Sequence, residues 1–399
     1  MKKTGWGLLE KLARDAGKKG RNQFKAGRIL AIAALALPFL AGSQTTLAAA
    51  LDGDVPLHGF ADVGYRHASK DLSGGQPVRG FYLGSLDLYF APQFGDRVKM
   101  LAELFFEFEE TGELAVEMER LQLGYAVSDR TTVWAGRFHT PFGYWNTAYH
   151  HGAQIQTSLM RPKFMEFEDL GGIMPVHTTG LWAIGKFRIS QGGTLTYDAY
   201  TGNGSRILSD SASGGVLDAN NSRDDNGNKT VGLKLSYDFG GSLEGLQLGA
   251  HGLKQEVGTY IGASPTPVSR TAVKMIGGYM AYFNHDWEGI AEYYAFNNQD
   301  LPTGTGSHQS SAGFAHLGYS FNTELTPYVR LEKADFDQGD SYFSQQASGR
   351  SYERQALGVR YNLNPRAAIK FEVNHTNQTD TPPTAGSFDE ARAQYAIRF

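Results

Sequence analysis

Short segments in which apolar and polar residues alternate dominate this chain. From Leu57 onward the segments are about ten residues long, which is the length of a tilted membrane strand, and clusters of Gly, Asn, Asp and Pro separate them. Alternation with period two is the pattern of a β-strand whose two faces meet different surroundings. We predict sixteen strands, at residues 57–66, 79–91, 97–109, 114–127, 130–138, 178–190, 193–202, 229–239, 244–254, 271–283, 286–297, 308–321, 324–335, 350–363, 366–376 and 388–399.

Composition removes several other classes of protein. Past residue 50 no apolar run approaches the ~20 residues that a membrane-spanning helix requires, so a helical membrane protein is excluded. The 399 residues include no cysteine, which excludes a disulfide scaffold, a thiolate zinc site and a cysteine nucleophile. A water-soluble β-protein and a membrane β-barrel remain.

The lengths of the connections favour the barrel. Links after even-numbered segments are short, such as 128–129, 284–285 and 364–365, whereas most links after odd-numbered segments are long, and the longest covers 139–177. Short turns on one rim and long loops on the other are typical of outer-membrane barrels. A soluble sandwich has no reason to keep this order through sixteen strands.

The first 50 residues have the pattern of a secretory signal peptide. Nine Lys and Arg precede the apolar run 29–42, and Ala48-Ala49-Ala50 then offers a cleavage site of small residues. We therefore expect residues 1–50 to be removed, and 51–399 to form the barrel. Residues 51–399 contain 28 basic and 39 acidic residues, a net charge of −11, which argues against nucleic acid as a partner.

The two faces of each predicted strand differ in chemistry. Leu233 and Leu235 share one face of segment 229–239, and Lys234 and Ser236 share the other. A charge facing lipid at mid-bilayer costs about 2–4 kcal/mol, so the charged face is expected to line a wet lumen. Aromatic residues near the short turns are expected to form an outward girdle at the membrane interface: Tyr89, Phe90, Tyr125, Tyr237, Phe239, Tyr319, Phe321, Tyr361, Tyr395 and Phe399.

The last segment, from Ala391 to Phe399, is an alternating strand that ends in phenylalanine. With the signal peptide and the sixteen strands, it makes the chain resemble Gram-negative outer-membrane porins. The resemblance implies that Tyr395, Ile397 and Phe399 are read by the barrel-assembly machinery, and that the chain forms a homotrimer. The short link 110–113 departs from general porins, in which the second external loop latches onto a neighbouring subunit.

The resemblance also implies that the third external loop, 139–177, folds inward and narrows the channel. Its stretch from Lys163 to Gly172 is similar to the Pro-Glu-Phe-Gly-Gly region of general porins. A narrower similarity, to phosphate-selective porins, rests on Gly136-Arg137-Phe138-His139-Thr140-Pro141-Phe142-Gly143 and on a basic wall. The basic residues are nevertheless interleaved with acids.

The non-apolar face supplies the candidate pore lining. The basic candidates are Arg120, Arg137, Lys186, Arg188, Lys234, Lys274, Arg330, Arg354, Arg360, Lys370, Arg392 and Arg398. The acidic candidates are Asp62, Glu103, Glu107, Asp198, Asp238, Glu288, Glu292, Glu332 and Glu372 on the wall, with Glu166, Glu168 and Asp169 in the loop. We expect the loop acids to face Arg354, Arg360, Arg392 and Arg398, because opposed charges across a narrow opening orient dipolar solutes. The alternative for any single residue is a polar interior in which these charges pair with one another.

No metal site and no cofactor are expected. His139, His150 and His151 lie in the third loop, but adjacent histidines do not easily converge on one ion. The stretch 224–228 is similar to a calcium loop, yet Leu233 stands where an EF-hand places its bidentate Glu.

The sequence therefore predicts an all-β, sixteen-stranded antiparallel transmembrane barrel. The expected function is passive diffusion of small hydrophilic solutes or ions across the outer membrane of a Gram-negative bacterium, without catalysis. Three alternatives remain open: a barrel that sheathes another exported protein, an outer-membrane surface enzyme, and a secreted binding protein.

Overall fold

The computed structural model describes residues 57–69, 77–108, 114–149, 152–167, 172–189, 192–209, 215–219, 224, 226–301, 306–380 and 386–399. The predicted signal peptide, the short second external link and the loop residues Glu168 and Asp169 lie outside them. Sixteen long strands form the wall. They are β1 (Leu57–Ala68), β2 (Val78–Phe90), β4 (Val98–Phe108), β5 (Leu114–Ser128), β6 (Thr131–His139), β7 (His177–Arg188), β8 (Thr194–Gly202), β11 (Thr230–Asp238), β12 (Leu246–Ile261), β13 (Ser269–Phe283), β14 (Trp287–Leu301), β15 (Ser307–Tyr319), β16 (Leu325–Asp335), β17 (Tyr352–Asn364), β18 (Ala367–Gln378) and β19 (Gly386–Arg398).

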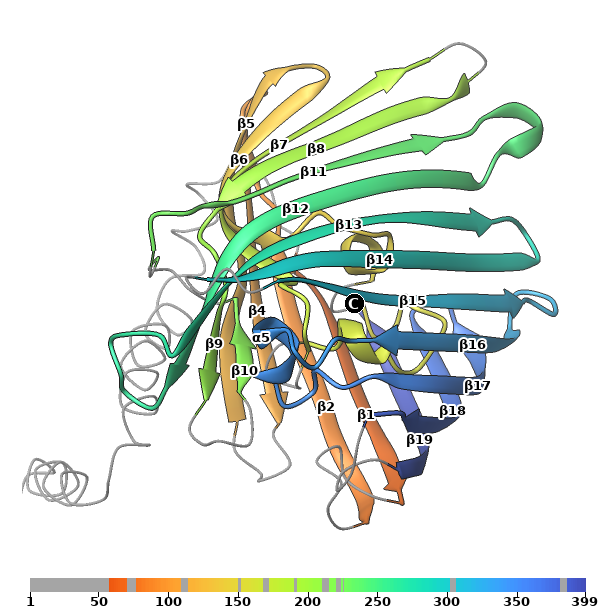
Figure 1. Cartoon of the computed structure of the whole chain (residues 1–399). Coiled ribbons are helices and arrows are strands. Elements are labelled where there is room, and N and C mark those ends of the chain that lie inside the picture. Colours follow the sequence, from red (N-terminus) through yellow and green to blue (C-terminus); the bar gives the residue numbers. More distant parts are fainter. Residues whose placement is uncertain are drawn as a thin grey trace, which may run out of the picture. The chain divides into compact units, whose positions relative to one another are not determined.

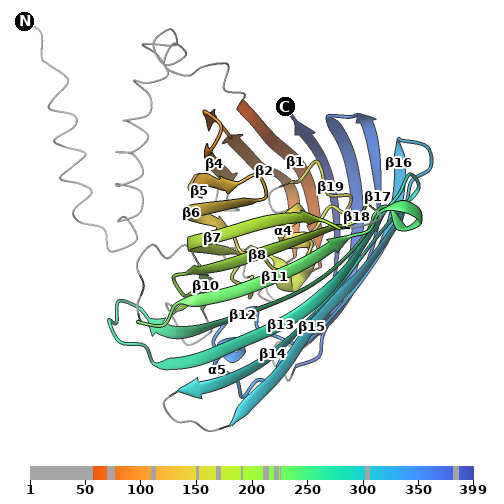
Figure 2. The same ribbon diagram turned by 90° about the horizontal axis from the view of Figure 1, so that it is seen from above.

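The wall is a closed antiparallel sheet. Each long strand pairs with the next along the chain, and β19 pairs with β1 from Ala68–Glu390 to Phe60–Arg398. Figure 2 shows β1 beside β19, where the ring of strands closes. The backbone N–H of Phe399 donates to the carbonyl of Gly59 (3.0 Å), so the last residue of the chain takes part in closure. Closure leaves no unpaired edge along the wall. The predicted fold class is confirmed.

The order of short and long connections is also as predicted. The turn between β5 and β6 covers 129–130 and that between β17 and β18 covers 365–366, whereas 140–176 separates β6 from β7. Three short strands lie in the connections: β3 (Gln93–Phe94), β9 (Arg206–Ser209) and β10 (Val216–Asp218). β9 pairs with β12 in parallel, which ties the long connection between β8 and β11 to the wall.

The outer face carries an apolar band. Leu233, Ile276, Leu331, Leu357 and Phe371 are each about half exposed or more, and they belong to five different strands. Their inward neighbours are buried and polar on several strands. Exposed apolar side chains over a closed sheet are what a lipid-facing surface requires. Among the described residues no helix combines the length and the apolar character that crossing a bilayer demands.

Two residues differ from the predicted faces. Lys274 is exposed on the face of β13 that carries Ile276 and Met280, opposite Lys254 of β12, so it points outward and not into the lumen. Tyr89 was expected in the outer girdle, but it lies on the inner face of β2, in register with Glu103 of β4. For Lys274 the alternation was followed in the wrong phase, because polar and apolar residues are mixed on both faces of β13. For Tyr89 the cause is a β-bulge: the pairing of β1 with β2 shifts by one residue between Val63–Leu83 and Ala61–Leu86, and this reverses the faces of β2.

Candidate channel constriction

The segment 140–176 folds into the barrel, as the resemblance to porins implied. It contains the short helices α4 (Trp145–Ala148) and η2 (Lys163–Met165), and α4 lies within the ring of strands (Figure 2). In Figure 1 the same segment is drawn in yellow, at the height of β13 to β15. We call residues 140–176 the inward loop.

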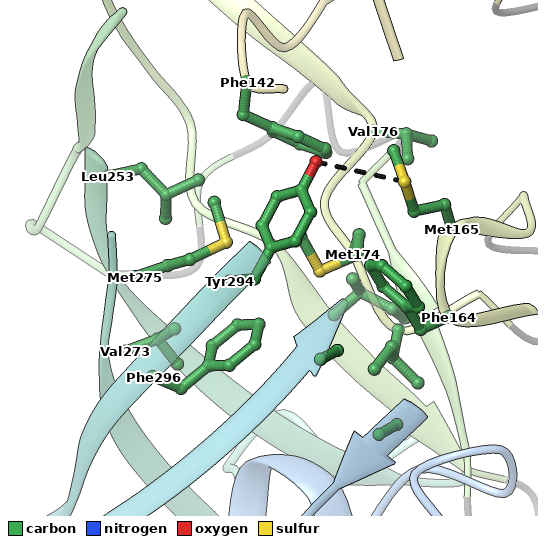
Figure 3. Close-up of a cluster of buried hydrophobic side chains, with 14 of the residues drawn as sticks. Phe142, Phe164, Met165, Met174, Val176, Leu253, Val273, Met275, Tyr294 and Phe296 are labelled. Atoms are coloured by element: carbon green, nitrogen blue, oxygen red, sulfur yellow. Dashed lines mark hydrogen bonds between the residues drawn. The ribbon is translucent and has the colours of Figure 1, made fainter. Parts of the chain in front are cut away.

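An apolar core fixes the inward loop against one arc of the wall. Phe142, Phe164 and Met165 of the loop are buried against Tyr294 and Phe296 of β14 (Figure 3). The Tyr294 hydroxyl donates to the sulfur of Met165 (3.9 Å). Burying side chains of this size contributes about 1.5–3 kcal/mol each. The inward face of β12 to β16 is therefore largely a packed protein core and not a water-filled surface.

The external connection 336–351 adds to this core. Its helix α5 (Ser341–Ser344) is capped by Asp340, whose side chain accepts from the N–H of Tyr342 (2.9 Å). Phe343 of this helix stacks on Phe336 at 4.4 Å between ring centroids, and Tyr342 donates to the carbonyl of Ile173 (2.6 Å). A second loop thus holds the C-terminal end of the inward loop.

Wall carboxylates accept hydrogen bonds from the backbone of the inward loop. Glu292 accepts from the N–H of Tyr144 (3.1 Å) and of Trp145 (2.6 Å). Glu372 accepts from the N–H of Leu159 (3.0 Å) and of Met160 (3.1 Å). Glu332 likewise accepts from the N–H of Lys163 (2.7 Å), and Glu288 accepts from a side chain of the loop, the Thr157 hydroxyl (2.7 Å). These groups supply the acceptors that buried N–H groups of irregular backbone need.

Wall cations donate to the loop's carbonyls in the same manner. Arg330 donates to the carbonyls of Met160 (2.8 Å) and Arg161 (3.2 Å). Arg360 donates to Gln156 (2.9 Å), and so does Lys370 (2.7 Å). Arg330 and Lys370 are fully buried. They lie inside the wall, where the alternation placed them, but they contact the loop and not open water.

A second cluster of charges lies where the loop approaches β1, β17 and β19. The Nε atoms of Arg66 and Arg392 both bind Glu390 Oε1 at 2.7 Å. Arg354 donates to the Thr376 hydroxyl (2.7 Å), and the loop contributes Arg161 and Glu166. We call Arg66, Arg161, Glu166, Arg354, Glu390 and Arg392 the arginine cluster.

The electrostatics of Glu166 show how close the loop comes to this cluster. Burial raises the pKa of the Glu166 carboxyl, while Arg392, Arg161 and Arg354 act in the opposite direction. Burial also lowers the pKa of the Lys163 ammonium to about 8, and Arg354 adds to the effect. With four arginines against two glutamates, the described part of the cluster carries an excess of positive charge.

The remaining predicted residues are distributed around the wall. Arg120 pairs with Glu103, Arg137 Nη2 lies 3.6 Å from Glu119, and Lys234 donates to the carbonyl of Gly143 (3.4 Å). Lys186 and Arg188 are exposed near the end of β7, Arg398 is exposed at the end of β19, and Glu107 is half-buried on β4. Tyr395 is exposed on the outer face of β19, and Phe399 follows that strand.

Three members of the arginine cluster were missed at the sequence level. Arg66 shares its face of β1 with Asp62, and Glu390 shares its face of β19 with Arg392. The alternation alone could have identified both residues. Arg161 could not be found in this way, because it lies in the inward loop, where alternation has no meaning.

Comparison with known proteins identifies the fold as that of Gram-negative outer-membrane porins. No protein-family model and no curated protein matches the sequence. Among solved structures, the anion-selective porin from Comamonas acidovorans is similar with a TM-score of 0.60 and 14% identity, over 87% of this chain and 99% of that one. The trimer form of OmpT from Vibrio cholerae matches with a TM-score of 0.57 and 12% identity, over 87% and 99% of the two chains. The channel DcaP of Acinetobacter baumannii matches with 0.55 and 12%, over 87% and 97%.

Proposed function

We propose that the chain is a porin of the Gram-negative outer membrane, through which small hydrophilic solutes or ions diffuse passively. The observation that carries the proposal is the division of the lumen by the inward loop. The loop packs against β12 to β16, and the arginine cluster lies where the loop approaches β1, β17 and β19. A barrel of this strand number is wide enough for an aqueous channel, and the narrowest section decides what passes.

The charge of the cluster supports a preference for anions. Arg66 and Arg392 both bind the carboxylate of Glu390, and the described cluster contains four arginines and two glutamates. Their side chains are 12% and 25% exposed, which leaves them in reach of water. The similarity to an anion-selective porin concerns the fold, so the preference proposed here rests on these residues. The trimer form of a similar structure supports a homotrimer as the assembly.

Planar-bilayer recordings test the proposal. The purified chain is expected to give stable ohmic steps, with a reversal potential in a KCl gradient that indicates an anion preference. The variant R66Q/R392Q is expected to lose most of that preference. R97Q/R366Q removes the same charge from two exposed turn residues and serves as the control. A silent bilayer would reject the channel, and equal selectivity in the two variants would reject the role of the cluster.

The inward loop argues against a barrel that sheathes another protein. Such a barrel needs an open lumen, whereas Trp145, Phe164 and Ile173 are buried inside this one. The loop therefore occupies space that a threaded partner would require.

The acid, histidine and serine residues at the external end of β15 do not form a hydrolytic set. His308 Nδ1 lies 2.8 Å from Asp337, and its Nε2 lies 3.7 Å from Asp300. The Ser341 hydroxyl donates to Asp300 (2.9 Å). A nucleophilic serine needs a general base at its hydroxyl, and here carboxylates face both ring nitrogens.

A further inference from the structure

Three side chains from adjacent strands converge at the base of the inward loop. Glu119 lies on β5, His139 is the last residue of β6, and His177 is the first residue of β7. One ligand atom from each lies within 4.8 Å of the others. His177 Nε2 and Glu119 Oε2 are already 2.6 Å apart, and the two imidazole rings lie 5.5 Å apart between centroids.

We propose that Glu119, His139 and His177 bind a divalent cation of the zinc class. Two imidazoles and one carboxylate are a donor set that Zn²⁺ accepts, with ligand bonds of about 2.0–2.2 Å and a fourth position open to water. Donor atoms within 4.8 Å of one another reach such a centre after side-chain adjustments on the order of 1 Å. The three residues stand far apart in the sequence, so the spacing of histidines could not reveal the site.

The register of the strands fixes this arrangement. His139 and His177 are paired directly across β6 and β7. On the other side of β6, Leu121 of β5 pairs with Arg137, which brings Glu119 to the level of His139. Backbone pairing therefore sets the level of each ligand before any ion binds, which lowers the conformational cost of binding.

Acidic side chains lie close to the three residues. Glu103 Oε2 lies 3.7 Å from His139 Nε2, and the buried Asp87 interacts electrostatically with Glu103 and Glu119. Two guanidinium groups oppose these acids: Arg120 on Glu103, and Arg137 at 3.6 Å from Glu119. Glu103 also offers an acceptor for an imidazole N–H, the usual partner of a metal-bound histidine.

An ion at this position would join both ends of the inward loop to β5. Residues 140–176 leave the wall at His139 and return to it at His177. His139 keeps about a tenth of its side chain exposed, which provides a route for the ion. Binding is expected to restrict motion of the loop. The effect of zinc on the loop rests on the proposed channel function. Zinc binding does not, because it is measured without recording channel currents.

Zinc binding to the tag-free protein in detergent tests the proposal. Isothermal titration with ZnCl₂ is expected to show one site per chain. We expect the zinc affinity to fall at least about tenfold in each of the variants H139N, H177N and E119Q. Mutation of a residue that only supports a metal ligand already lowers metal affinity by that factor. H285N/H375N removes two exposed histidines and is the matched control, with unchanged binding expected. The proposal would be overturned if the wild type did not bind zinc, or if H139N and H177N bound zinc as tightly as the wild type.

A spectroscopic measurement on the wild-type protein covers the case in which a variant does not fold. Co²⁺ bound in place of Zn²⁺ is expected to give the visible absorption of a four-coordinate site with nitrogen and oxygen ligands, and Zn²⁺ is expected to remove it. Zinc X-ray absorption is expected to show the scattering of two imidazoles. A spectrum of six oxygen ligands would contradict the site, whether or not the protein conducts ions in bilayers.

Discussion

Replacing Arg330 by methionine tests how the inward loop is held. Arg330 is fully buried, and it contacts Glu332 (2.8 Å), Glu372 (3.2 Å) and two carbonyls of the loop. R330M leaves two carboxylates in the interior without their cation, although each keeps a tyrosine hydroxyl and a backbone N–H. Breaking a buried ion pair costs about 3–5 kcal/mol. A loss of about 4 kcal/mol would shift the docking equilibrium of the loop by roughly a thousandfold.

Single-channel conductance and the guanidinium unfolding midpoint measure the effect. We expect R330M to raise conductance and current noise and to lower the midpoint. The control K333M breaks the neighbouring, exposed pair between Lys333 and Glu353, and no change is expected. R330M/E332Q is expected to recover part of the loss, because it removes one uncompensated charge. If R330M behaves like K333M in both assays, the wall charges do not hold the loop.

Three further predictions concern other parts of the chain. The lowered pKa of Lys163, about 8, means that its charge is lost as pH rises from 7 to 9. The anion preference should then fall about twofold, which corresponds to the Coulomb energy of one charge ~8 Å away in water. The measurement is a titration of the reversal potential with pH, and the prediction is refuted if K163M shows the same pH dependence as the wild type. G143A should undock the loop and raise conductance, because Gly143 has φ 58° and a Cβ would lie 2.1 Å from Glu292, at a strain of about 1–2 kcal/mol; unchanged conductance would contradict it. F399A should reduce assembled barrel in cells more than refolding in detergent, as judged by heat-modifiable gel mobility, since the terminal backbone bonds to Gly59 remain; equal loss in both would oppose an assembly signal.

The strands could be predicted because each strand of a membrane barrel shows a local alternation of apolar and polar residues. Each strand must show apolar residues to lipid at every second position, so Leu233 and Leu235 reveal their strand without knowledge of its neighbours. The order of short and long connections added the topology. The phase of the pattern was less secure where both faces carry mixed residues, as for Lys274, and where a β-bulge switches the faces, as before Tyr89.

The contacts of the inner residues could not be predicted from the same pattern. Alternation places Arg330 and Lys370 inside the barrel, but a charge inside can face water or the backbone of a folded loop. Both face the loop, and this depends on the path of residues 140–176, which no periodicity records. The loop carries the large aromatic residues Trp145 and Phe164, which need a packed surface. The position of that surface on β14 follows only from the three-dimensional structure.

The packed arc of the barrel has a consequence for the register of β13. Val273, Met275 and Tyr279 point into the core, while Ile276 and Met280 point to lipid. If β13 slipped by one residue, apolar side chains would replace apolar side chains on both faces over much of its length. The free energy of burial in the bilayer would therefore discriminate little against the wrong register. The register of β13 must therefore be fixed by packing rather than by polarity. The inward loop is complementary in shape to the inward side chains of β13 and not to the outward ones, so packing against the loop aligns this strand.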